Sequence, residues 1–225
     1  MRLQHNPAIR ADHPGLAVGT LSATGVTPEL AVDEAIEKYL DQATRRLADG
    51  PESEFPEIQA WRRAFTKMGL KPTQYRCASE SLLRRLRKER TLPRIHPVID
   101  LCNAVSVAFA IPVAVLDVAK IGGALEVRYA RGDEKYVTFA GTVENPNPGE
   151  VIFADEDGQA HARRWTNRQS GHSAVSSSTS DVLIVSEGLH ATASEDVGRL
   201  IAAVAAELAT AGVSVGPHQQ PQLED

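Results

Sequence analysis

The stretch HPVIDLCNAVSVAFAIPVAVLD, residues 96–117, decides the fold class because it places a helix and a strand next to each other. Its first part is apolar on nearly every side, which predicts a buried helix that ends before Pro112. The residues from Pro112 onward, PVAVLD, form a β-type run with the length of a short strand. A buried helix that leads directly into a strand indicates a chain that combines helices with a sheet.

Helical patterns precede this stretch, and mainly strand patterns follow it. Apolar residues at helical spacing predict helices over 27–50, 55–69 and 79–89, and again over 194–212, with Ser79 and Ser194 as N-caps. β-type runs occupy 112–117, 124–130, 135–141, 151–155 and 181–188, residues 160–165 alternate, and 143–150 is typical of a loop. This order predicts an α+β fold with several N-terminal helices, a central mixed or antiparallel sheet and a C-terminal helix packed on it. We expect one domain over residues 1–213 and a disordered tail over 214–225.

Composition excludes several classes of protein. The 225 residues contain no apolar run long enough to span a membrane, and the first fifteen residues lack the apolar centre of a signal peptide. The two cysteines, Cys77 and Cys102, are too few for a disulfide framework or a cysteine-based zinc site, and Cys102 is expected in the core. No HExxH, Walker loop, nucleophile elbow or dinucleotide fingerprint is present. We therefore expect a soluble cytoplasmic protein with no metal and no cofactor.

Charge is distributed unevenly along the chain. The net charge is −5, yet residues 62–94 contain eleven basic and two acidic side chains, so that this segment carries +9 and the rest carries −14. A basic face on an acidic protein fits a polyanionic partner, and a solvated helix whose charges are balanced by acidic neighbours is the alternative. Residues of the predicted helix 79–89 and its end are the candidates for contacting phosphates: Arg84, Arg85, Arg87, Lys88 and Arg90.

A second unusual stretch is RRWTNRQSGHS, residues 163–173, which lies between two predicted strands. Arginine, tryptophan, asparagine, glutamine, histidine and serine are crowded together there, and loops held by a sheet commonly carry function. Trp165 has two possible roles, as a stacking platform for a base or as a core residue. Arg164 and Arg168 could bind a carboxylate or a phosphate of a ligand. Alternatively, they and Arg163 form ion pairs with the acidic residues of the turn 155–157.

Polar residues inside apolar segments are a third signal. Asp100 and Asn103 interrupt the buried helix and share one of its faces, being three residues apart. Glu187 comes near the end of the apolar run 181–188. A buried polar group must be hydrogen-bonded, so each of the three either ties its element to a neighbouring loop or lines a pocket.

The order of these motifs resembles the B3/B4 domain, the editing domain of the bacterial phenylalanyl-tRNA synthetase β subunit, which also occurs as free-standing proteins. The resemblance covers about residues 55–190 and rests on a V-x-D-x-x-N helix, a proline, a strand ending in Asp, a glycine turn, an E-x-R strand and an R-R-W-x-x-R-like segment. In this chain these are Val98, Asp100, Asn103, Pro112, Asp117, Gly122, Gly123, Glu126, Arg128, Arg163, Arg164, Trp165, Asn167 and Arg168.

The resemblance implies hydrolysis of the ester that joins a wrongly attached amino acid to the 3′ end of a tRNA. In this reaction a positioned water attacks the ester, and no metal takes part. On this basis Asp100, Asn103 and His172 are the catalytic candidates. The substrate-binding candidates are Arg164, Trp165, Asn167, Arg168 and Glu187. We expect aminoacylated tRNA as the partner, with no DNA and no membrane.

Two departures from the synthetase pattern concern recognition of the amino acid. The synthetase has a histidine where this chain has Ala114, and a glutamate in its G-G-x-E-S loop where the corresponding "QSGHS" has His172. Both departures argue against tyrosine, the amino acid that the synthetase domain removes. They also leave open a second class of function, in which the fold binds an amino acid, another small molecule or RNA without catalysis.

Overall fold

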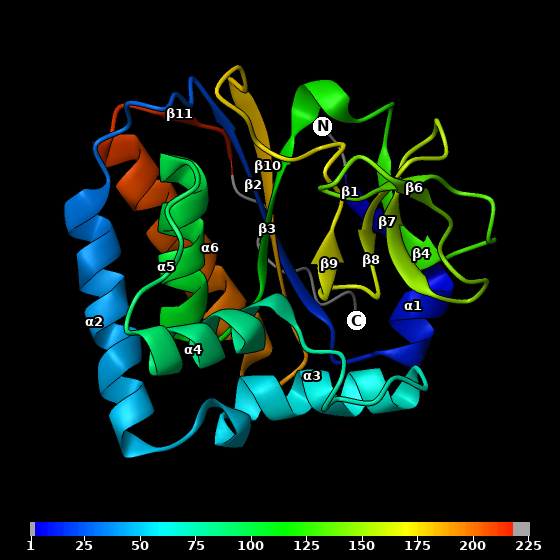
Figure 1. The fold of residues 1–225 in the computed structure, drawn as a ribbon, viewed down its shortest axis with the longest axis horizontal. Helices are drawn as coiled ribbons and strands as arrows, with labels where there is room; N and C mark the ends of the chain where they lie inside the picture. The colour runs from blue at the N-terminus through cyan, green and yellow to red at the C-terminus, as the bar shows by residue number, and fades with distance from the viewer. Residues whose placement is uncertain (1–2, 218–225) are drawn as a thin grey trace.

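The structure is a computed structural model that describes residues 3–217, and its elements form two sheets with helices around them (Figure 1). The first sheet is antiparallel and has the order β11-β2-β10-β3, with β2 Ala17–Thr24, β3 Val113–Asp117, β10 Asp181–Gly188 and β11 Ser214–Val215. The second has the order β1-β4-β7-β8-β9, with β1 Leu3–His5, β4 Leu125–Tyr129, β7 Val151–Ala154, β8 Ala160–Arg163 and β9 Arg168–Gln169. It is mixed, because β1 runs parallel to β4 and the other pairs are antiparallel. A hairpin of β5 Tyr136–Val137 and β6 Val143–Glu144 lies beside it.

The four-stranded sheet separates two hydrophobic cores. On one face it packs against α5 Pro97–Phe109 and α6 Ala193–Thr210, and α2 Asp33–Asp49 packs on the outer side of α5 (Figure 1). On the other face it meets the five-stranded sheet, with α1 Pro7–Asp12, α3 Pro56–Lys67 and α4 Ala78–Glu89 closing that core. Short 3₁₀ turns at Glu52–Glu54 and Val118–Lys120 complete the elements of residues 3–217. Side chains alternate across β3 and β10, so each strand contributes to both cores.

The observed α+β architecture confirms the fold class expected from the sequence. The predicted helices and the main strands are present, including α5 and β3 from the stretch 96–117. The helix that covers the four-stranded sheet comes very close to it at Gly19, where a Cβ atom would lie 2.6 Å from Ile201 and 2.7 Å from Val197 of α6. Glycine is required at this point of β2 because no side chain fits between strand and helix.

Several boundaries differ from the expectation. The first structured elements are β1, α1 and β2, none of which the sequence pattern indicated, and β2 is an inner strand. The N-cap positions are Cys77 for α4 and Thr192 for α6, in place of Ser79 and Ser194. Residues 143–150, expected as a loop, begin with β6, and the strand expected over 135–141 is limited to β5. The disordered tail was expected to begin at residue 214, but Ser214 and Val215 form β11, which pairs with β2. Residues 218–225 of the expected tail lie outside the described part of the chain.

Candidate functional site

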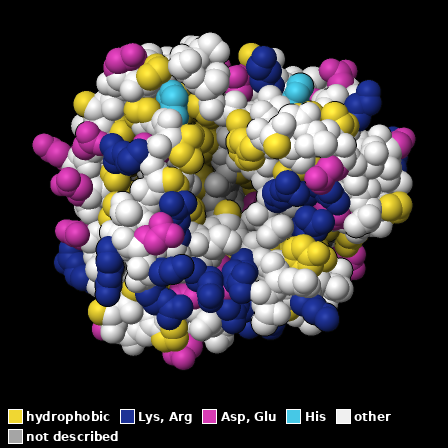
Figure 2. Space-filling view, in the orientation of Figure 1, with side chains coloured by type: hydrophobic (Ala, Val, Ile, Leu, Met, Phe, Trp, Pro, Cys, Tyr) yellow, Lys and Arg dark blue, Asp and Glu magenta, His cyan; other side chains and the backbone are white. Residues whose placement is uncertain are grey.

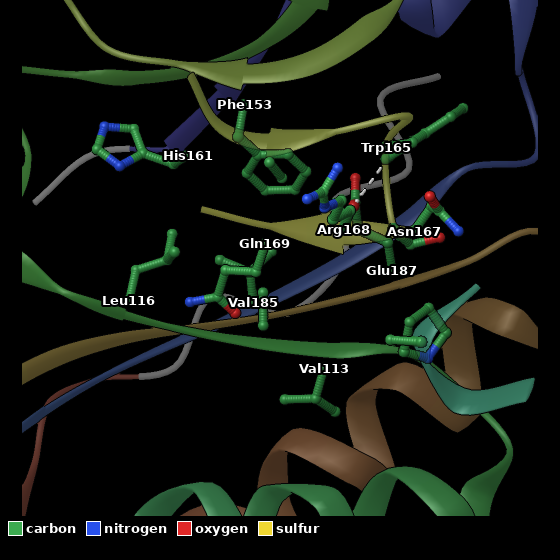
Figure 3. A pocket seen from close by; sticks show the side chains of 15 residues that line it. Val113, Leu116, Phe153, His161, Trp165, Asn167, Arg168, Gln169, Val185 and Glu187 are labelled. Carbon is green, nitrogen blue, oxygen red and sulfur yellow. Dashed lines mark hydrogen bonds between the residues drawn. The ribbon is translucent and has the colours of Figure 1, made fainter. Parts of the chain in front are cut away.

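A pocket lies between the two sheets (Figure 3), and Ala78 at the start of α4 is one of the residues that line it. Leu116 and Val185 reach it from β3 and β10 because alternate residues of these strands point away from the helical core. Phe153 and His161 face it from β7 and β8 of the other sheet. Part of the remaining wall comes from β9 and the turn that precedes it, so the polar stretch 163–173 does contribute to a pocket.

The two ends of the pocket differ in chemistry. Leu116, Phe153 and Val185 surround one end, whereas Glu187, Asn167 and Arg168 lie together at the other end (Figure 3). A mostly apolar cavity with a few convergent polar groups is typical of a small-molecule site. The arrangement suits a ligand that has one apolar and one polar part.

Glu187 is the buried acidic side chain of this pocket. Only 2% of it is exposed, and its Oε1 atom lies 2.6 Å from Nε2 of His5 on β1. The indole Nε1 of Trp165 donates a 3.0 Å hydrogen bond to the other carboxylate oxygen. The N-terminal strand therefore supports Glu187 through His5, which does not itself line the pocket, and sequence reasoning had not pointed to His5.

Trp165 is a core residue and has no exposed surface. Its ring stands edge-on to Trp61 and His13, with centroid distances of 5.0 and 4.8 Å. Burial on this scale leaves no face of the indole for a nucleotide base. Of the two roles considered for Trp165, the structure supports the core role, with the added task of orienting Glu187.

The turn that carries Trp165 has an unusual backbone. Arg164 and Trp165 have φ values of +48° and +59°, in the left-handed region that non-glycine residues rarely adopt. Neighbours hold the turn in place: the side-chain amide of Asn167 donates to the carbonyl of Arg76 at 2.7 Å, and the Ala78 N–H donates to the carbonyl of Thr166 at 2.8 Å. The turn is thus fastened to the segment that begins α4, and Asn167 serves this contact as well as lining the pocket.

The arginines of the stretch do not pair with the acidic turn 155–157, which was the alternative considered for them. Arg163 binds Glu150 through two nitrogens at 2.9 Å and Glu144 at 2.7 Å. Arg168 lies 3.6 Å from Glu144 and remains largely exposed at the mouth of the pocket. Arg164 stacks over the ring of Tyr75 at 4.9 Å, and no side-chain hydrogen bond or ion pair of Arg164 is found among residues 3–217.

Asp155 instead takes part in a buried chain of hydrogen bonds on the pocket wall. Its Oδ2 lies 3.0 Å from Nε2 of His161, and Nδ1 of His161 lies 2.8 Å from Oγ of Ser173. Burial raises the pKa of Asp155, but backbone N–H donors, including that of Gly122, outweigh it and hold the pKa below the ordinary value. An ionised Asp155 makes Nε2 of His161 the donor, so Nδ1 accepts from the serine hydroxyl. Burial lowers the pKa of His161, which favours the neutral ring.

His161 rather than His172 is therefore the pocket histidine. His172 lies just outside the pocket lining, with its ring centroid 5.9 Å from that of His161. A lone histidine in an alternating strand gives no functional signal, so His161 could not have been selected from the sequence. Both of its ring nitrogens are already used, which leaves the ring carbons to face the pocket.

Asp100 and Asn103 are not brought to the pocket. They lie on α5, which covers the opposite face of the four-stranded sheet. Oδ1 of Asp100 accepts from the Ile95 N–H at 2.8 Å, and Oδ2 lies 3.4 Å from Nε of Arg94. Asp100 thus ties the helix to the preceding loop, the structural role considered above. Cys102, on the same helix, is buried, and burial raises the pKa of its thiol to about 12.

The basic segment forms a surface beside the pocket. Lys and Arg side chains gather over α4, below the central hollow (Figure 2). Part of this charge is neutralised, because Arg84 and Arg87 both bind the buried Glu52, at 3.2 and 3.1 Å. Arg85 pairs with Glu89 on the same helix at 2.9 Å, whereas Lys88 and Arg90 make no ion pair within residues 3–217. One buried carboxylate shared by two guanidinium groups leaves a net positive charge at the surface.

Two kinds of feature are not found among the described residues. No group of three or more His, Cys, Asp or Glu side chains within residues 3–217 is arranged to hold a metal ion. None of the described helices has both the length and the apolar character needed to cross a membrane.

Comparisons with known proteins agree with this geometry. The family described as the B3/4 domain matches residues 60–203. The phenylalanine–tRNA ligase beta subunit of Nocardia farcinica is 32% identical over 143 residues, covering 61% of this chain and 17% of the relative. That of Vibrio cholerae is 36% identical over 91 residues, covering 40% of this chain and 11% of the relative. The chain therefore spans less than a fifth of the length of these curated relatives.

The fold also matches a solved structure. An N-terminal fragment of the phenylalanyl-tRNA synthetase beta subunit from Pyrococcus horikoshii superposes with a TM-score of 0.52 at 10% identity. The match covers 95% of this chain and 50% of that one. At this identity the similarity concerns the fold alone.

Proposed function

The chain belongs to the B3/4 domain family, and from this premise we propose that it is a hydrolase that acts in trans to remove a wrongly attached amino acid from tRNA. The observation that carries the proposal is the pocket between the sheets, where the buried Glu187–His5 pair lies at the polar end and a basic surface lies outside. An aminoacyl ester has the matching parts: a side chain, an ammonium and ester group, and a polyanionic tRNA body.

Glu187 and His5 are the groups best placed to activate water. A carboxylate hydrogen-bonded to an imidazole can accept a proton from a water molecule held at the polar end of the pocket. The water oxygen then forms a bond to the ester carbon, the bond from that carbon to the ribose oxygen breaks, and the proton passes to the departing ribose oxygen. The products are the free amino acid and tRNA with an intact 3′ end.

The other pocket residues position the substrate. Asn167 and Arg168 lie at the same end as Glu187, so they are placed to contact the ester and the terminal ribose or phosphate (Figure 3). His172, beside His161, borders the site and contacts the substrate less directly. We assign Asp100 and Asn103 to support of α5, because they lie beyond the four-stranded sheet, and we assign no proton transfer to them.

The tRNA body is proposed to lie over α4. Lys88 and Arg90 have no acidic partner within the described part of the chain. Arg164, which is not among the residues that line the pocket, stacks on Tyr75 with its guanidinium donors available. Contacts of this kind bind phosphates and are largely independent of base sequence. A cytoplasmic location follows from the same proposal, because that is where mischarged tRNA arises.

The test compares Glu187→Gln with a matched control. Purified protein is incubated with tRNAs carrying labelled amino acids, and ester loss is followed against spontaneous hydrolysis. Glu187→Gln keeps the side-chain shape but removes the base, so the rate should fall at least a hundredfold, which is typical for loss of a general base. The control Glu207→Gln, whose carboxylate binds Lys38 on the helical side, should retain the parent rate. An unchanged rate in Glu187→Gln would contradict the assigned role.

A non-catalytic binder is the second candidate, and one observation favours it. Glu187 already accepts from Trp165 and pairs with His5, an arrangement that a purely ligand-binding pocket would share. Such a protein would be stabilised by a free amino acid, by about 2.7 kcal/mol at a hundredfold excess over Kd. The hydrolase should instead respond to a non-hydrolysable aminoacyl-adenosine and only weakly to the free amino acid, which a thermal-shift screen distinguishes.

A further inference from the structure

We infer that the amino acid removed has a small aliphatic side chain, of the size of alanine or valine, and that an aromatic one is rejected. This inference rests on the proposed function and specifies its substrate class. It is carried by two features of the pocket: its volume and the close packing of the residues that form its apolar end.

The volume is too small for an aromatic ring. The cavity measures about 60 Å³. An apolar protein cavity that binds benzene has a volume of roughly 150 Å³. The side chain of phenylalanine or tyrosine contains such a ring and one carbon more, so neither enters without displacement of the walls. One to three methyl groups fit.

The walls of the apolar end resist displacement. Leu116 and Val185 belong to neighbouring antiparallel strands that pair across β3 and β10, and Phe153 belongs to an inner strand of the opposite sheet. All three are at most 3% exposed, and all belong to the same core. Close-packed side chains between two sheets transmit strain instead of yielding, so a larger substrate would meet a steric penalty.

Several polar atoms near the apolar end are already paired within the protein. His161 uses both ring nitrogens, toward Asp155 and Ser173. The amide nitrogen of Gln169 donates to the carbonyl of Val115 at 2.8 Å, which holds this side chain across the gap between the sheets. Ala114, the next pocket residue along β3, carries only a methyl group. Within residues 3–217 the side-chain oxygen of Gln169 makes no hydrogen bond and is free to accept from a hydroxyl, so the rejection of tyrosine rests on the size of the pocket.

The experiment varies the amino acid on a constant tRNA. One tRNA is acylated in turn with alanine, valine, phenylalanine and tyrosine, and kcat/KM for ester loss is measured with the full chain. Alanine and valine should exceed phenylalanine and tyrosine at least tenfold. If phenylalanine or tyrosine is removed as fast as alanine, the inference is overturned while the hydrolase proposal stands. If no ester is lost with any of them, the hydrolase proposal itself fails.

Two variants move the size limit in opposite directions. Phe153→Ala removes a ring from the wall and should raise the rate for phenylalanine relative to alanine at least tenfold. Ala114→Leu fills the pocket and should suppress valine more than alanine, which keeps the test decisive if the first variant does not fold. Phe109→Ala on the helical side is the control and should leave the preference unchanged. If neither pocket variant alters the preference, the side chain of the substrate amino acid does not bind in this pocket.

Discussion

Replacement of Trp165 by phenylalanine separates the two roles that its sequence context allows. The variant keeps an aromatic ring but removes the indole N–H that donates to Glu187 at 3.0 Å. Both residues are almost completely buried, so water does not replace the lost donor. A hydrogen bond to a charged group contributes about 1.5–3 kcal/mol.

The smaller ring adds a second cost. Trp165 packs edge-on against Trp61 and His13, and contacts of this type contribute about 0.5–1.5 kcal/mol each. Partial loss of these contacts brings the expected total to about 2–4 kcal/mol. In a chain of this length, 1 kcal/mol shifts Tm by about 2–4 °C, so thermal unfolding is a sensitive assay.

A double-mutant cycle identifies the hydrogen bond itself. Unfolding free energies are measured by denaturant titration for Trp165→Phe, Glu187→Gln and the pair. Because the carboxylate is the acceptor, the two changes should be coupled by at least about 0.5 kcal/mol. Strict additivity, or a Trp165→Phe variant as stable as the parent that binds RNA more weakly, would refute the core assignment of Trp165.

Three other predictions follow from the structure. The double variant Arg85→Glu, Lys88→Glu should bind all tRNAs more weakly, with a smaller dependence of affinity on salt concentration. Turnover of a small aminoacyl ester should be unchanged, because neither side chain lines the pocket. If the variant binds tRNA as tightly as the parent across a salt titration, α4 is only a solvated helix and does not bind tRNA. Burial lowers the pKa values of His13, His96 and His161 in the folded protein. The stability that their neutral forms contribute is therefore present above the unfolded pKa of about 6.5 and is lost as pH falls through the folded pKa values. Chemical denaturation between pH 7 and 5 should show this loss of stability, and His161→Gln should make the pH dependence shallower. Gly19→Ala should destabilise the fold by about 1–3 kcal/mol because its methyl group overlaps Ile201 and Val197, with Gly198→Ala on the open side of α6 as the control that should cost nothing.

The parts of the fold that the sequence predicted are those determined by local pattern. The apolar helix α5 and the strand β3 follow from periodicity and from Pro112, and α6 follows from its regular apolar face. The N-terminal strands could not be predicted in this way. β2 is held by its pairing with β10, which is 171 residues away in the chain at the register Ala17↔Gly188. It also contains a glycine, which weakens any strand signal.

The structure brings some of the predicted site residues to one pocket and places others elsewhere; their roles remain predictions. The polar stretch 163–173 reaches the pocket because a hairpin turn projects from the sheet, and Glu187 reaches it as the penultimate residue of a strand. Asp100 and Asn103 share a helical face, as expected, but which side of the sheet that helix covers depends on tertiary packing. His5 required the structure because its partner Glu187 is 182 residues away in the chain. His161 required it because its position between Asp155 and Ser173 depends on how the strands pair.

The most direct test of the central claim is a single-turnover deacylation assay with excess protein over alanyl- or valyl-tRNA. The ester has a measurable spontaneous loss, which supplies the baseline in the same buffer. The account predicts loss well above this baseline for the parent chain and the Glu207→Gln control, and loss at the baseline for Glu187→Gln. Loss at the baseline with the parent chain, for these and all other aminoacyl-tRNAs tried, would contradict the assignment of this pocket to ester hydrolysis.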